Sequence, residues 1–466
     1  MSATYDVVVI GSGPGGYVAA IRAGQLGLKT AIVEKDDRFG GTCLLRGCIP
    51  TKSMLESASL ADHARHADDF GINVGEVSID IAKVLKRKDR VIKANAGGVA
   101  FLLKKNKVTT YNGFGALAGP GRVSVTNDEG VTELGAKHII LATGSAVRHF
   151  PGFDVDGERI LTSDELLELS EIPKHLLVLG AGAVGVEFAS VYRSFGAEVT
   201  IVELQDRLVP LEDEDVSAEF AKAFKRRGIK VKTGTKCLGL EMDGDKVKAS
   251  FEEPGGKQTT VRVSHCLVAI GRRPVTENIG LEKTRIQTER GFLHTDGFGQ
   301  TGEPGVYAIG DIVAGTPQLA HAASHEAILT VEHIAGLDVE PINYLHCPNC
   351  TYSNPEVGSV GLTEAQAKDK GYAIKVGKFP FTAVGKAKVI NDTTGFVKIV
   401  AEEQYGEILG VHIIGPHATE LIAEAVPLLR LECTAEELAR TIHAHPTLAE
   451  SIGEAAHATL GHAIHM

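Results

Sequence analysis

Two cysteines near the start of this chain have a spacing that suits reversible thiol chemistry. Cys43 and Cys48 are separated by four residues in the segment Gly-Gly-Thr-Cys-Leu-Leu-Arg-Gly-Cys-Ile-Pro-Thr-Lys, residues 40–52. Two such thiols can form a disulfide that accepts two electrons, and the thiolate is the reactive form. Arg46 lies between them and Lys52 follows, so local positive charge favours the thiolate. On spacing alone, two small buried hydrophobes are an equally good interpretation.

The residues just before this pair favour the redox interpretation. An apolar run at residues 5–10 is typical of a buried parallel strand, and Gly11-Ser-Gly13-Pro-Gly-Gly16 follows it. We expect a helix to about residue 26 and a strand over residues 29–33 that ends at Glu34. Together these elements predict a dinucleotide-binding unit.

Each residue of this unit has a separate expected task. Gly11 permits the tight turn, Gly13 lets the backbone approach a pyrophosphate, and Gly16 lets the helix pack closely on the strand. The helix N-terminus would hold the phosphates through its free N–H groups and its dipole. Glu34 would accept hydrogen bonds from a ribose.

The same unit occurs a second time. Residues 175–179 predict a strand, Gly180-Ala-Gly182-Ala-Val-Gly185 a turn, and residues 198–202 a strand that ends at Glu203. A helix to about residue 195 should lie between them. In both units the acid follows the first glycine by 23 residues. The chain is therefore predicted to bind two dinucleotides in two similar domains, with a thiol pair beside the first.

Several further motifs extend this pattern over nearly the whole chain. They are Ala142-Thr143-Gly144, Gly271-Arg272-Arg273-Pro274, Ala308-Ile309-Gly310-Asp311 and His443-Ala-His445-Pro446-Thr447-Leu-Ala-Glu450. With the two glycine turns and the cysteine segment, they make the chain resemble the dihydrolipoamide dehydrogenases. These are disulfide flavoprotein reductases that serve 2-oxo acid dehydrogenase complexes and the glycine cleavage system. The resemblance implies FAD in the first unit, NAD in the second, and oxidation of dihydrolipoyl groups by NAD.

The resemblance also implies roles in the chemistry. Cys43 would be the interchange thiol that meets the substrate, and Cys48 the thiol that lies against the flavin. Lys52 would lie near the flavin ring with Glu187 as its partner, since a buried charge needs one.

An acid–base pair is implied as well. His445 would remove a proton from a substrate thiol, with Glu450 orienting its ring. The other histidines of the C-terminal part, His443, His457, His462 and His465, are interpreted as structural. The family more often has Asn-Val where this chain has Leu45-Arg46, which leaves the thiol acidity open.

The predicted cofactor residues fall into two groups. For FAD they are Gly11, Gly13, Gly16, Glu34, Lys52, Gly115, Gly144, Asp311 and Ala320. For NAD they are Gly180, Gly182, Gly185, Glu203 and Gly271. Because Glu203 would repel a 2′-phosphate, we expect NAD rather than NADP. No metal site is predicted.

A second cysteine pair, Cys347-Pro-Asn-Cys350, is open to three interpretations. The segment opens a predicted strand over residues 350–353, which favours a structural role, and a regulatory disulfide is the alternative. A zinc site would need further ligands, and the nearby His346 is not enough. We therefore expect the chemistry to depend on Cys43 and Cys48 alone.

These features predict an α/β fold with two Rossmann-like dinucleotide-binding domains and an α+β C-terminal dimerisation domain. The predicted segments are 1–149 for FAD, 150–275 for NAD, 276–345 returning to FAD, and 346–466 for the interface. Residues 83–105 predict a long helix whose charges form a solvated face. Further strands are expected at residues 137–141, 306–309 and 397–401.

Composition limits the classes of partner. The 466 residues carry a net charge of −11, and no Lys/Arg cluster is interleaved with aromatics, so nucleic-acid binding is not expected. No apolar run reaches the roughly 18 residues that a membrane helix needs. We expect a cytoplasmic homodimer that meets the dihydrolipoyl domain of an acyltransferase or an H-protein.

Two alternatives remain open at this stage. One is another pyridine nucleotide-disulfide reductase, similar to glutathione or mercuric reductases. The other is mainly a structural role as a subunit docked on a multienzyme complex.

Overall fold

The structure is a computed structural model that describes residues 3–466. The chain divides into two compact units, each made of segments that are distant in the sequence. The first contains the residues up to Ser53 together with Lys83–Arg148 and Arg272–Tyr344. The second contains Met54–Ala82, His149–Gly271 and Leu345–Met466. The predicted division into four segments stays a prediction.

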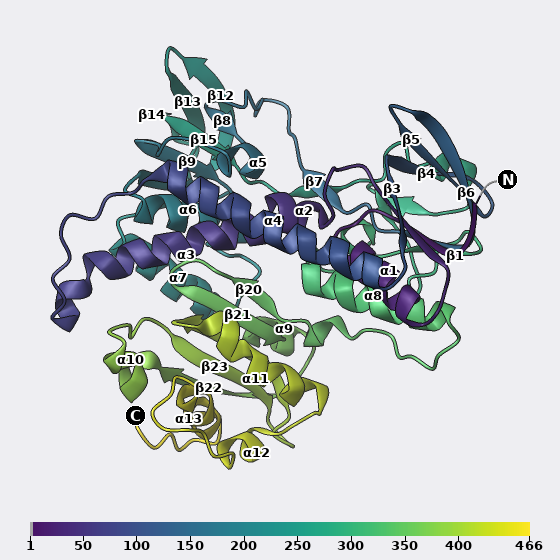
Figure 1. The fold of residues 1–466 in the computed structure, drawn as a ribbon. Helices are drawn as coiled ribbons and strands as arrows, with labels where there is room; N and C mark the ends of the chain where they lie inside the picture. Colours follow the sequence, from purple (N-terminus) through teal and green to yellow (C-terminus); the bar gives the residue numbers. More distant parts are fainter. Residues whose placement is uncertain (1–2) are drawn as a thin grey trace. The chain divides into compact units, whose positions relative to one another are not determined.

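The first unit is built on a seven-stranded sheet (Figure 1). Its order is β3-β2-β1-β6-β5-β4, and β19 pairs with β6 beside that path. The strands are β1 (Ala3–Ile10), β2 (Thr30–Glu34), β3 (Thr109–Asn112), β4 (Phe114–Gly119), β5 (Arg122–Asn127), β6 (Gly130–Leu141) and β19 (Val306–Ala308). The pairs β4–β5 and β5–β6 are antiparallel, whereas the other pairs of neighbouring strands are parallel.

The central strand β1 is apolar at successive positions because both of its faces are covered. Val7 and Val9 face one hydrophobic cluster, and Val8 and Ile10 face another on the opposite side of the sheet. A strand covered on both faces needs apolar residues at every position rather than at alternate ones. The helices on this unit are α1 (Pro14–Gln25), α2 (Gly41–Arg46), α4 (Ile81–Lys105) and α8 (Ala320–Ile334), and α3 (Cys48–Arg65) begins in it.

The long charged helix is confirmed as α4, but the expectation of a fully solvated charged face is wrong at one position. The side chain of Lys88 is 0% exposed, and its Nζ lies 3.3 Å from a carboxylate oxygen of Asp89. A charge run in the sequence does not show which of its members the rest of the fold covers.

The second unit contains three sheets. A five-stranded parallel sheet has the order β11-β10-β9-β15-β8, and a three-stranded antiparallel sheet has the order β12-β13-β14. Their strands are β8 (Ile160–Leu161), β9 (His175–Leu179), β10 (Glu198–Val202), β11 (Lys230–Lys232), β12 (Lys236–Asp243), β13 (Lys246–Glu252), β14 (Gln258–Val263) and β15 (His265–Val268). The helices of this part are α5 (Ser163–Leu166), α6 (Ala183–Ser194) and α7 (Glu214–Arg226).

The C-terminal part forms a five-stranded antiparallel sheet in the order β20-β21-β24-β23-β22. The strands are β20 (Asn349–Thr351), β21 (Glu356–Gly361), β22 (Ile374–Pro380), β23 (Phe396–Glu402) and β24 (Ile408–Gly415). The helices are α9 (Glu364–Asp369), α10 (Gly385–Val389), α11 (Ala418–Arg430), α12 (Ala435–Ala439) and α13 (Glu450–Thr459). The predicted α/β fold with two similar nucleotide domains and an α+β C-terminal domain is confirmed. The strand expected at residues 350–353 begins and ends earlier, as β20.

A buried ion-pair cluster ties this last sheet to α7. Lys398 on β23 is 2% exposed, and its Nζ lies 2.8 Å from Asp213, 2.9 Å from Asp215 and 2.8 Å from Glu364. Burying one cation costs little only when such partners satisfy its donors. The cluster therefore fixes the start of α7 against β23.

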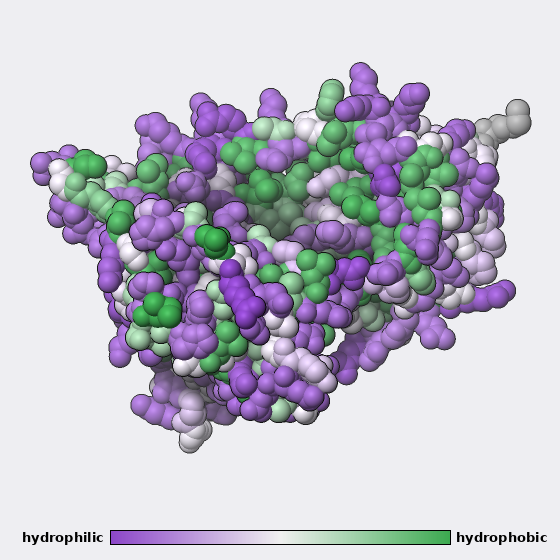
Figure 2. Space-filling model, turned by 90° about the horizontal axis from the view of Figure 1, so that it is seen from below, coloured by the Kyte–Doolittle hydropathy of each residue, from purple (hydrophilic) through white to green (hydrophobic). Residues whose placement is uncertain are grey.

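The surface carries both polar and apolar groups. The face in Figure 2 is mostly hydrophilic, and its hydrophobic residues lie in separate groups. Among residues 3–466, no helix is long and apolar enough to cross a membrane.

Candidate active site

The first glycine turn joins β1 to α1, and its three glycines are needed for different reasons. A Cβ on Gly11 would lie 2.3 Å from the carbonyl oxygen of Ala142, and one on Gly16 would lie 1.9 Å from that of Gly11. Among the described residues, no heavy atom lies within 4 Å of where a Cβ on Gly13 would be. Gly11 and Gly16 therefore serve the packing of the chain, whereas Gly13 faces open space at the N-terminus of α1. That is the arrangement a pyrophosphate site requires.

The acid at the end of β2 is tied to the same turn. The Glu34 side chain accepts the N–H of Ser12 at 2.8 Å, its hydroxyl at 2.6 Å, and the N–H of Asp36 at 2.9 Å. Glu34 is 6% exposed, so these bonds offset the cost of burying its charge. The structure thus brings together the turn and the acid that the motif predicts.

The second glycine turn repeats this geometry. A Cβ on Gly180 would lie 2.4 Å from the carbonyl oxygen of Ala269, and one on Gly185 would lie 2.0 Å from that of Gly180. Gly182 again has no described heavy atom within 4 Å of its Cβ position. Glu203 accepts the N–H of Ala181 at 2.7 Å and that of Gln205 at 2.8 Å.

The two units also match beyond the motif. The carbonyl of Ser12 in the first turn accepts the N–H of Gly40 at 3.0 Å, and the carbonyl of Ala181 in the second accepts that of Val209 at 2.9 Å. In both cases the donor follows the acceptor by 28 residues. At this equivalent point the first unit begins the segment that carries the cysteines.

The cysteine segment packs directly on the first glycine turn. Gly41 has φ +56° and starts α2, and a Cβ there would lie 2.6 Å from Cα of Gly13. Cys43 lies on α2 and Cys48 is the first residue of α3. The glycines before the pair are therefore required for the close approach of the thiols to the expected phosphate turn, a reason that the motif alone does not give.

The two sulfur groups contact each other, and this contact couples their protonation. Both cysteines are half-buried. A hydrogen bond with Cys48, burial, and the charge of Cys48 raise the pKa of Cys43 well above its usual value, while Lys52 acts in the opposite direction. The two thiols therefore take up and release protons as a coupled pair rather than independently.

Arg46 does not supply the positive charge that the sequence suggested. It forms an ion pair with Asp36, so its charge is compensated locally. Lys52, one turn after Cys48 on α3, is the cation that lowers the pKa of Cys43. The substitution of Leu45-Arg46 for the more common Asn-Val therefore leaves the thiol pair under the influence of Lys52.

Asp311 is held by residues that sequence reasoning missed. It follows β19 in a short 3-10 helix (Gly310–Ile312), and its Oδ2 accepts the hydroxyl of Ser145 at 2.5 Å. Arg272 donates to the hydroxyl and to the carbonyl oxygen of Ser145, both at 2.7 Å. The sequence identified Asp311, but it named Arg272 only as part of the Gly271-Arg272-Arg273-Pro274 motif.

The other predicted cofactor residues lie at strand ends and turns. Gly115 on β4 packs against the side chains of Ile10 and Val33, where a Cβ would lie 2.9 and 3.0 Å away. Gly144 follows β6 with φ +72°, and Ala320 is the first residue of α8. Gly271 has φ +115° and follows β15.

His445 and Glu450 form the contact that the sequence predicted. Nδ1 of His445 lies 2.8 Å from Oε1 of Glu450, the first residue of α13, and the N–H of Thr447 donates to Oε2 at 2.9 Å. Burial raises the pKa of Glu450, but the bonds from Thr447 and His445 outweigh this and lower it. The carboxylate therefore stays charged and holds the ring, whose side chain is 77% exposed.

Neighbouring histidines expected to be structural also meet carboxylates. His443 lies 2.7 Å from Glu424, and His465 lies 2.6 Å from Glu454. The contact of His443 fixes the segment that carries His445 to α11.

Glu187 is a buried acid on α6, directly after the second glycine turn. It is 4% exposed, and its Oε1 accepts the N–H of Tyr352 at 3.0 Å. Tyr352 follows β20, the strand that contains Cys350, and no sequence signal connected these segments. Lys52 lies in the other unit, so the predicted pairing with Glu187 stays a prediction.

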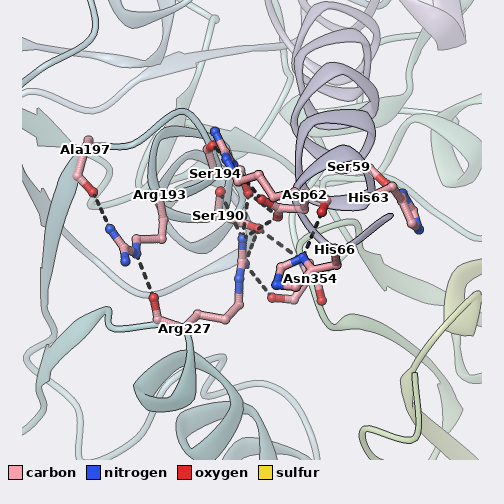
Figure 3. A network of polar contacts seen from close by, with 11 residues as sticks. Ser59, Asp62, His63, His66, Ser190, Arg193, Ser194, Ala197, Arg227 and Asn354 are labelled. Carbon is pink, nitrogen blue, oxygen red and sulfur yellow. Dashed lines mark hydrogen bonds and ion pairs between the residues drawn. The ribbon is translucent and has the colours of Figure 1, made fainter. Parts of the chain in front are cut away.

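A network centred on Arg227 fixes the far end of α6 (Figure 3). Its guanidinium donates to the hydroxyls of Ser190 and Ser194 at 2.7 Å and to the carbonyl oxygen of Asn354 at 2.7 Å. It also lies 3.3 Å from Asp62 on the C-terminal half of α3. The helix that carries Glu187 is thus held along its length.

The second cysteine pair lies at the edge of the C-terminal sheet. Cys347 and Cys350 are half-buried, and Asn349 between them donates to Glu212 at 2.5 Å. Among residues 3–466, no group of three or more His, Cys, Asp or Glu side chains is placed to hold a metal ion.

Comparisons with known proteins identify the family. Residues 5–327 match the family described as pyridine nucleotide-disulphide oxidoreductase, and residues 347–456 match its dimerisation domain. The dihydrolipoyl dehydrogenase of Bacillus subtilis is 48% identical, and that of Zymomonas mobilis is 46% identical, each covering 100% of both chains. The crystal structure of LpdA from Mycobacterium tuberculosis has a TM-score of 0.90 at 30% identity, covering 97% of this chain and 99% of that one.

Proposed function

The chain belongs to the pyridine nucleotide-disulphide oxidoreductase family, and we propose that within it the protein is a dihydrolipoyl dehydrogenase with FAD and NAD as cofactors. The reaction converts a dihydrolipoyl group and NAD to a lipoyl group, NADH and a proton. The observation that carries the proposal is the cysteine segment packed on the first glycine turn, where a Cβ on Gly41 would lie 2.6 Å from Gly13.

FAD fits the first unit and supplies a two-electron acceptor between the thiols and the nicotinamide. Gly13 and the N-terminus of α1 would hold its pyrophosphate, Glu34 its ribose, and Asp311 its ribityl chain. Gly115, Gly144 and Ala320 would contribute close backbone approaches, and Lys52 would lie near the ring.

The thiol steps give the two cysteines different tasks. A substrate thiolate attacks Sγ of Cys43 in the disulfide and releases Cys48 as a thiolate. The second substrate thiol then attacks the mixed disulfide, which leaves the lipoyl ring oxidised and Cys43 as a thiol. The hydrogen bond between the two sulfur groups lets them share the one remaining proton, which suits a step that leaves one thiol and one thiolate.

His445 is the proposed base for the substrate thiol. Its ring is oriented by Glu450 at 2.8 Å, while its other nitrogen faces away from that contact. An exposed ring nitrogen held in one orientation can take a proton from a thiol that a second subunit brings to it.

The nucleotide site in the second unit is proposed to select NAD. Glu203 is fixed to the second glycine turn by the N–H of Ala181, at the end of the strand where the nucleotide ribose is expected. A 2′-phosphate there would meet a carboxylate of like charge. Gly180, Gly182, Gly185 and Gly271 would line the same site.

A homodimer is proposed, with His445 of one chain serving the thiols of the other. The match to a dimerisation domain supports it, and so does Ile442, which is 97% exposed close to His445. An apolar side chain and a catalytic histidine exposed together suit an isologous interface.

Mixing two inactive variants tests the shared site. Cys43→Ser and His445→Gln subunits are each expected to be inactive, and a mixed dimer should regain one of its two sites. No recovery after demonstrated subunit exchange would show that each site is built within one chain.

The natural substrate is proposed to be the dihydrolipoyl domain of an acyltransferase or an H-protein, and the protein is proposed to work in the cytoplasm. The test of function compares kcat/KM for dihydrolipoamide with NAD against that for glutathione disulfide with NADPH. Dihydrolipoamide should be preferred by at least about 100-fold, in line with the specificity of disulfide reductases built around one substrate. Preference for glutathione disulfide would favour the reductase alternative, and no turnover of either would favour a structural subunit.

A further inference from the structure

Glu326 is a buried acid in the middle of α8 that none of the sequence motifs assigns to the site. It is 6% exposed, and burial raises its pKa, with the negative charge of Asp311 adding to this effect. The N–H of Gly310 and the hydroxyl of Tyr344 lower the pKa in return. Burying a carboxylate destabilises the fold unless hydrogen-bond donors replace the water that the carboxylate loses.

The first partner is the backbone at the end of β19. The N–H of Ile309 still bonds to the carbonyl of Leu141 in the sheet, but the chain then leaves the sheet at Gly310, with φ +73°. The N–H of Gly310 points to α8 and donates to Oε2 of Glu326 at 2.5 Å. A buried N–H without such an acceptor would lose a hydrogen bond made to water in the unfolded chain.

The turn is packed as well as hydrogen-bonded. A Cβ on Gly310 would lie 3.3 Å from Cβ of Ala323, one turn before Glu326 on α8. The second oxygen of Glu326 accepts the hydroxyl of Tyr344 at 2.8 Å. Glu326 therefore joins α8, the end of β19 and the segment near Tyr344.

The residue after Gly310 is Asp311, whose side chain is held from the opposite direction. Ser145 donates to Asp311 at 2.5 Å, and Arg272 fixes Ser145 through two bonds of 2.7 Å. The position of the Asp311 carboxylate thus depends on two supports. Ser145 and Arg272 act on the side chain, and Glu326 acts on the backbone from which it projects.

We propose that Glu326 is a positioning residue for the flavin site, which acts by fixing Gly310 and hence the direction of the Asp311 side chain. The inference rests on the proposed function, because it takes the site of Asp311 to be that of FAD. It assigns to Glu326 a role in cofactor affinity rather than contact with the reacting atoms.

The expected effect depends on the bonds that are lost. Glu326→Ala removes the acceptor of Gly310, and the Asp311 turn can then relax. A cavity of about 250 Å³ beside Glu326 is lined also by Asp296, Thr316, Thr330 and Tyr344, so water could enter and replace part of the lost bond. We therefore expect the Kd for FAD to rise about 10-fold rather than by several powers of ten.

Two variants separate the two bonds of Glu326. Glu326→Gln keeps a carbonyl oxygen for Gly310 and should bind FAD within about 3-fold of the parent, since only the charge is lost. Tyr344→Phe removes the other contact and should also stay within about 3-fold. Glu332→Ala is the matched control, because Glu332 lies on the same helix but pairs with Arg22 near the surface at 2.6 Å.

The experiment prepares the apoprotein of each variant, titrates it with FAD by fluorescence, and records the flavin absorption spectrum. Glu326→Ala should weaken FAD binding and alter the spectrum, whereas the Gln and control variants should not. A double-mutant cycle with Asp311→Asn supplies the test of mechanism. If Glu326 acts through Asp311, the effect of Glu326→Ala should shrink when Asp311 is already changed.

Unchanged FAD affinity in Glu326→Ala, or full additivity with Asp311→Asn, would overturn the inference even if thermal stability falls. If the Ala variant does not fold, Glu326→Met keeps the side-chain volume and removes both acceptors, and the same outcomes apply. Failure of the parent apoprotein to bind FAD would instead contradict the proposed function.

Discussion

The two dinucleotide units share a hydrogen-bond pattern but differ in the path of the chain after it. In the first, Ser12 accepts from Gly40, and Gly40 and Gly41 have φ of +127° and +56°. In the second, Ala181 accepts from Val209, a β-branched residue with φ +42° that precedes Pro210. Glycines allow the first chain to turn back onto its phosphate turn, whereas the second chain leads away into α7.

This difference explains how the same motif can hold one cofactor that stays bound and another that exchanges. The first turn is covered by the cysteine segment, and its acid, Glu34, is 6% exposed. The second has a half-buried acid, followed by Leu204 at 68% exposure. A covered turn suits a group that stays bound through many turnovers, and an open one suits a nucleotide that must exchange in each cycle.

The largest expected effect comes from the glycines that face open space. Gly13→Ala should abolish FAD retention and activity, and Gly182→Ala should raise KM for NAD by about 10- to 100-fold, since the added methyl meets only the cofactor. The free energy of unfolding of the apoprotein should change by less than about 1 kcal/mol in both variants, because the chain leaves room for the added methyl group.

Matched substitutions at the packed glycines give the contrast. Gly11→Ala and Gly180→Ala should destabilise the apoprotein, because their Cβ would lie 2.3 and 2.4 Å from carbonyl oxygens. Chemical unfolding of all four variants measures this. Equal destabilisation by Gly13→Ala and Gly11→Ala would remove the distinction between cofactor and packing glycines.

The second prediction concerns the choice of nucleotide. The parent should prefer NAD over NADP by about 100-fold or more, because a carboxylate meets the added phosphate. Glu203→Ala should reduce that ratio to about 10-fold or less. Glu34→Ala, the equivalent change in the first unit, should weaken FAD binding without altering the ratio. Equal kcat/KM values for both nucleotides in the parent would mean that Glu203 does not face the ribose.

The helices after the two turns are also held differently, which gives a third prediction. Arg227 belongs to the network of α6. Arg227→Met should lower the free energy of unfolding by about 2–3 kcal/mol, because Asp62 would lose a partner in a partly buried site. Arg22 on α1 pairs with Glu332 at the surface, with side-chain exposures of 32% and 22%. Arg22→Met should therefore lower the free energy of unfolding by less than about 1 kcal/mol. Urea unfolding of the two variants would contradict this reasoning if their order were reversed.

How far these contrasts could be predicted from the sequence depends on the range of the interaction. Strands β9 and β10 begin and end where their apolar runs predict, because burial on both faces leaves a local signature. The glycine turns and their acids were predictable because the motif places them at fixed spacings within a short stretch of sequence.

The remaining features depend on segments that meet only in the fold. Nothing in the local sequence shows that Lys88 is buried or that Tyr352 donates to Glu187. The three-stranded sheet of β12, β13 and β14 was also not expected, because its strands are mostly exposed or half-buried and contain no continuous apolar run. Contacts across long sequence separations decide these positions.

The smallest effect is expected at the second cysteine pair. The double substitution Cys347→Ser and Cys350→Ser should leave turnover of dihydrolipoamide within about 2-fold, because Cys43 and Cys48 already supply the thiols that the reaction needs. Its control is Cys43→Ser, which should be inactive. Loss of activity in a folded double variant, or stoichiometric zinc in the parent, would assign the pair a role in catalysis.

The central claim is that Cys48 is the thiolate that lies against the flavin while Cys43 meets the substrate. Anaerobic reduction of the holoprotein with two electrons, followed by absorption spectroscopy, tests it most directly. A long-wavelength flavin–thiolate band should appear in the parent after reduction. It should be present in Cys43→Ser before any reductant is added, because the Cys48 thiol of that variant has no disulfide partner, and it should be absent in Cys48→Ser. A band that survives Cys48→Ser and disappears in Cys43→Ser would reverse the roles of the two cysteines, and a parent without any such band would contradict the account.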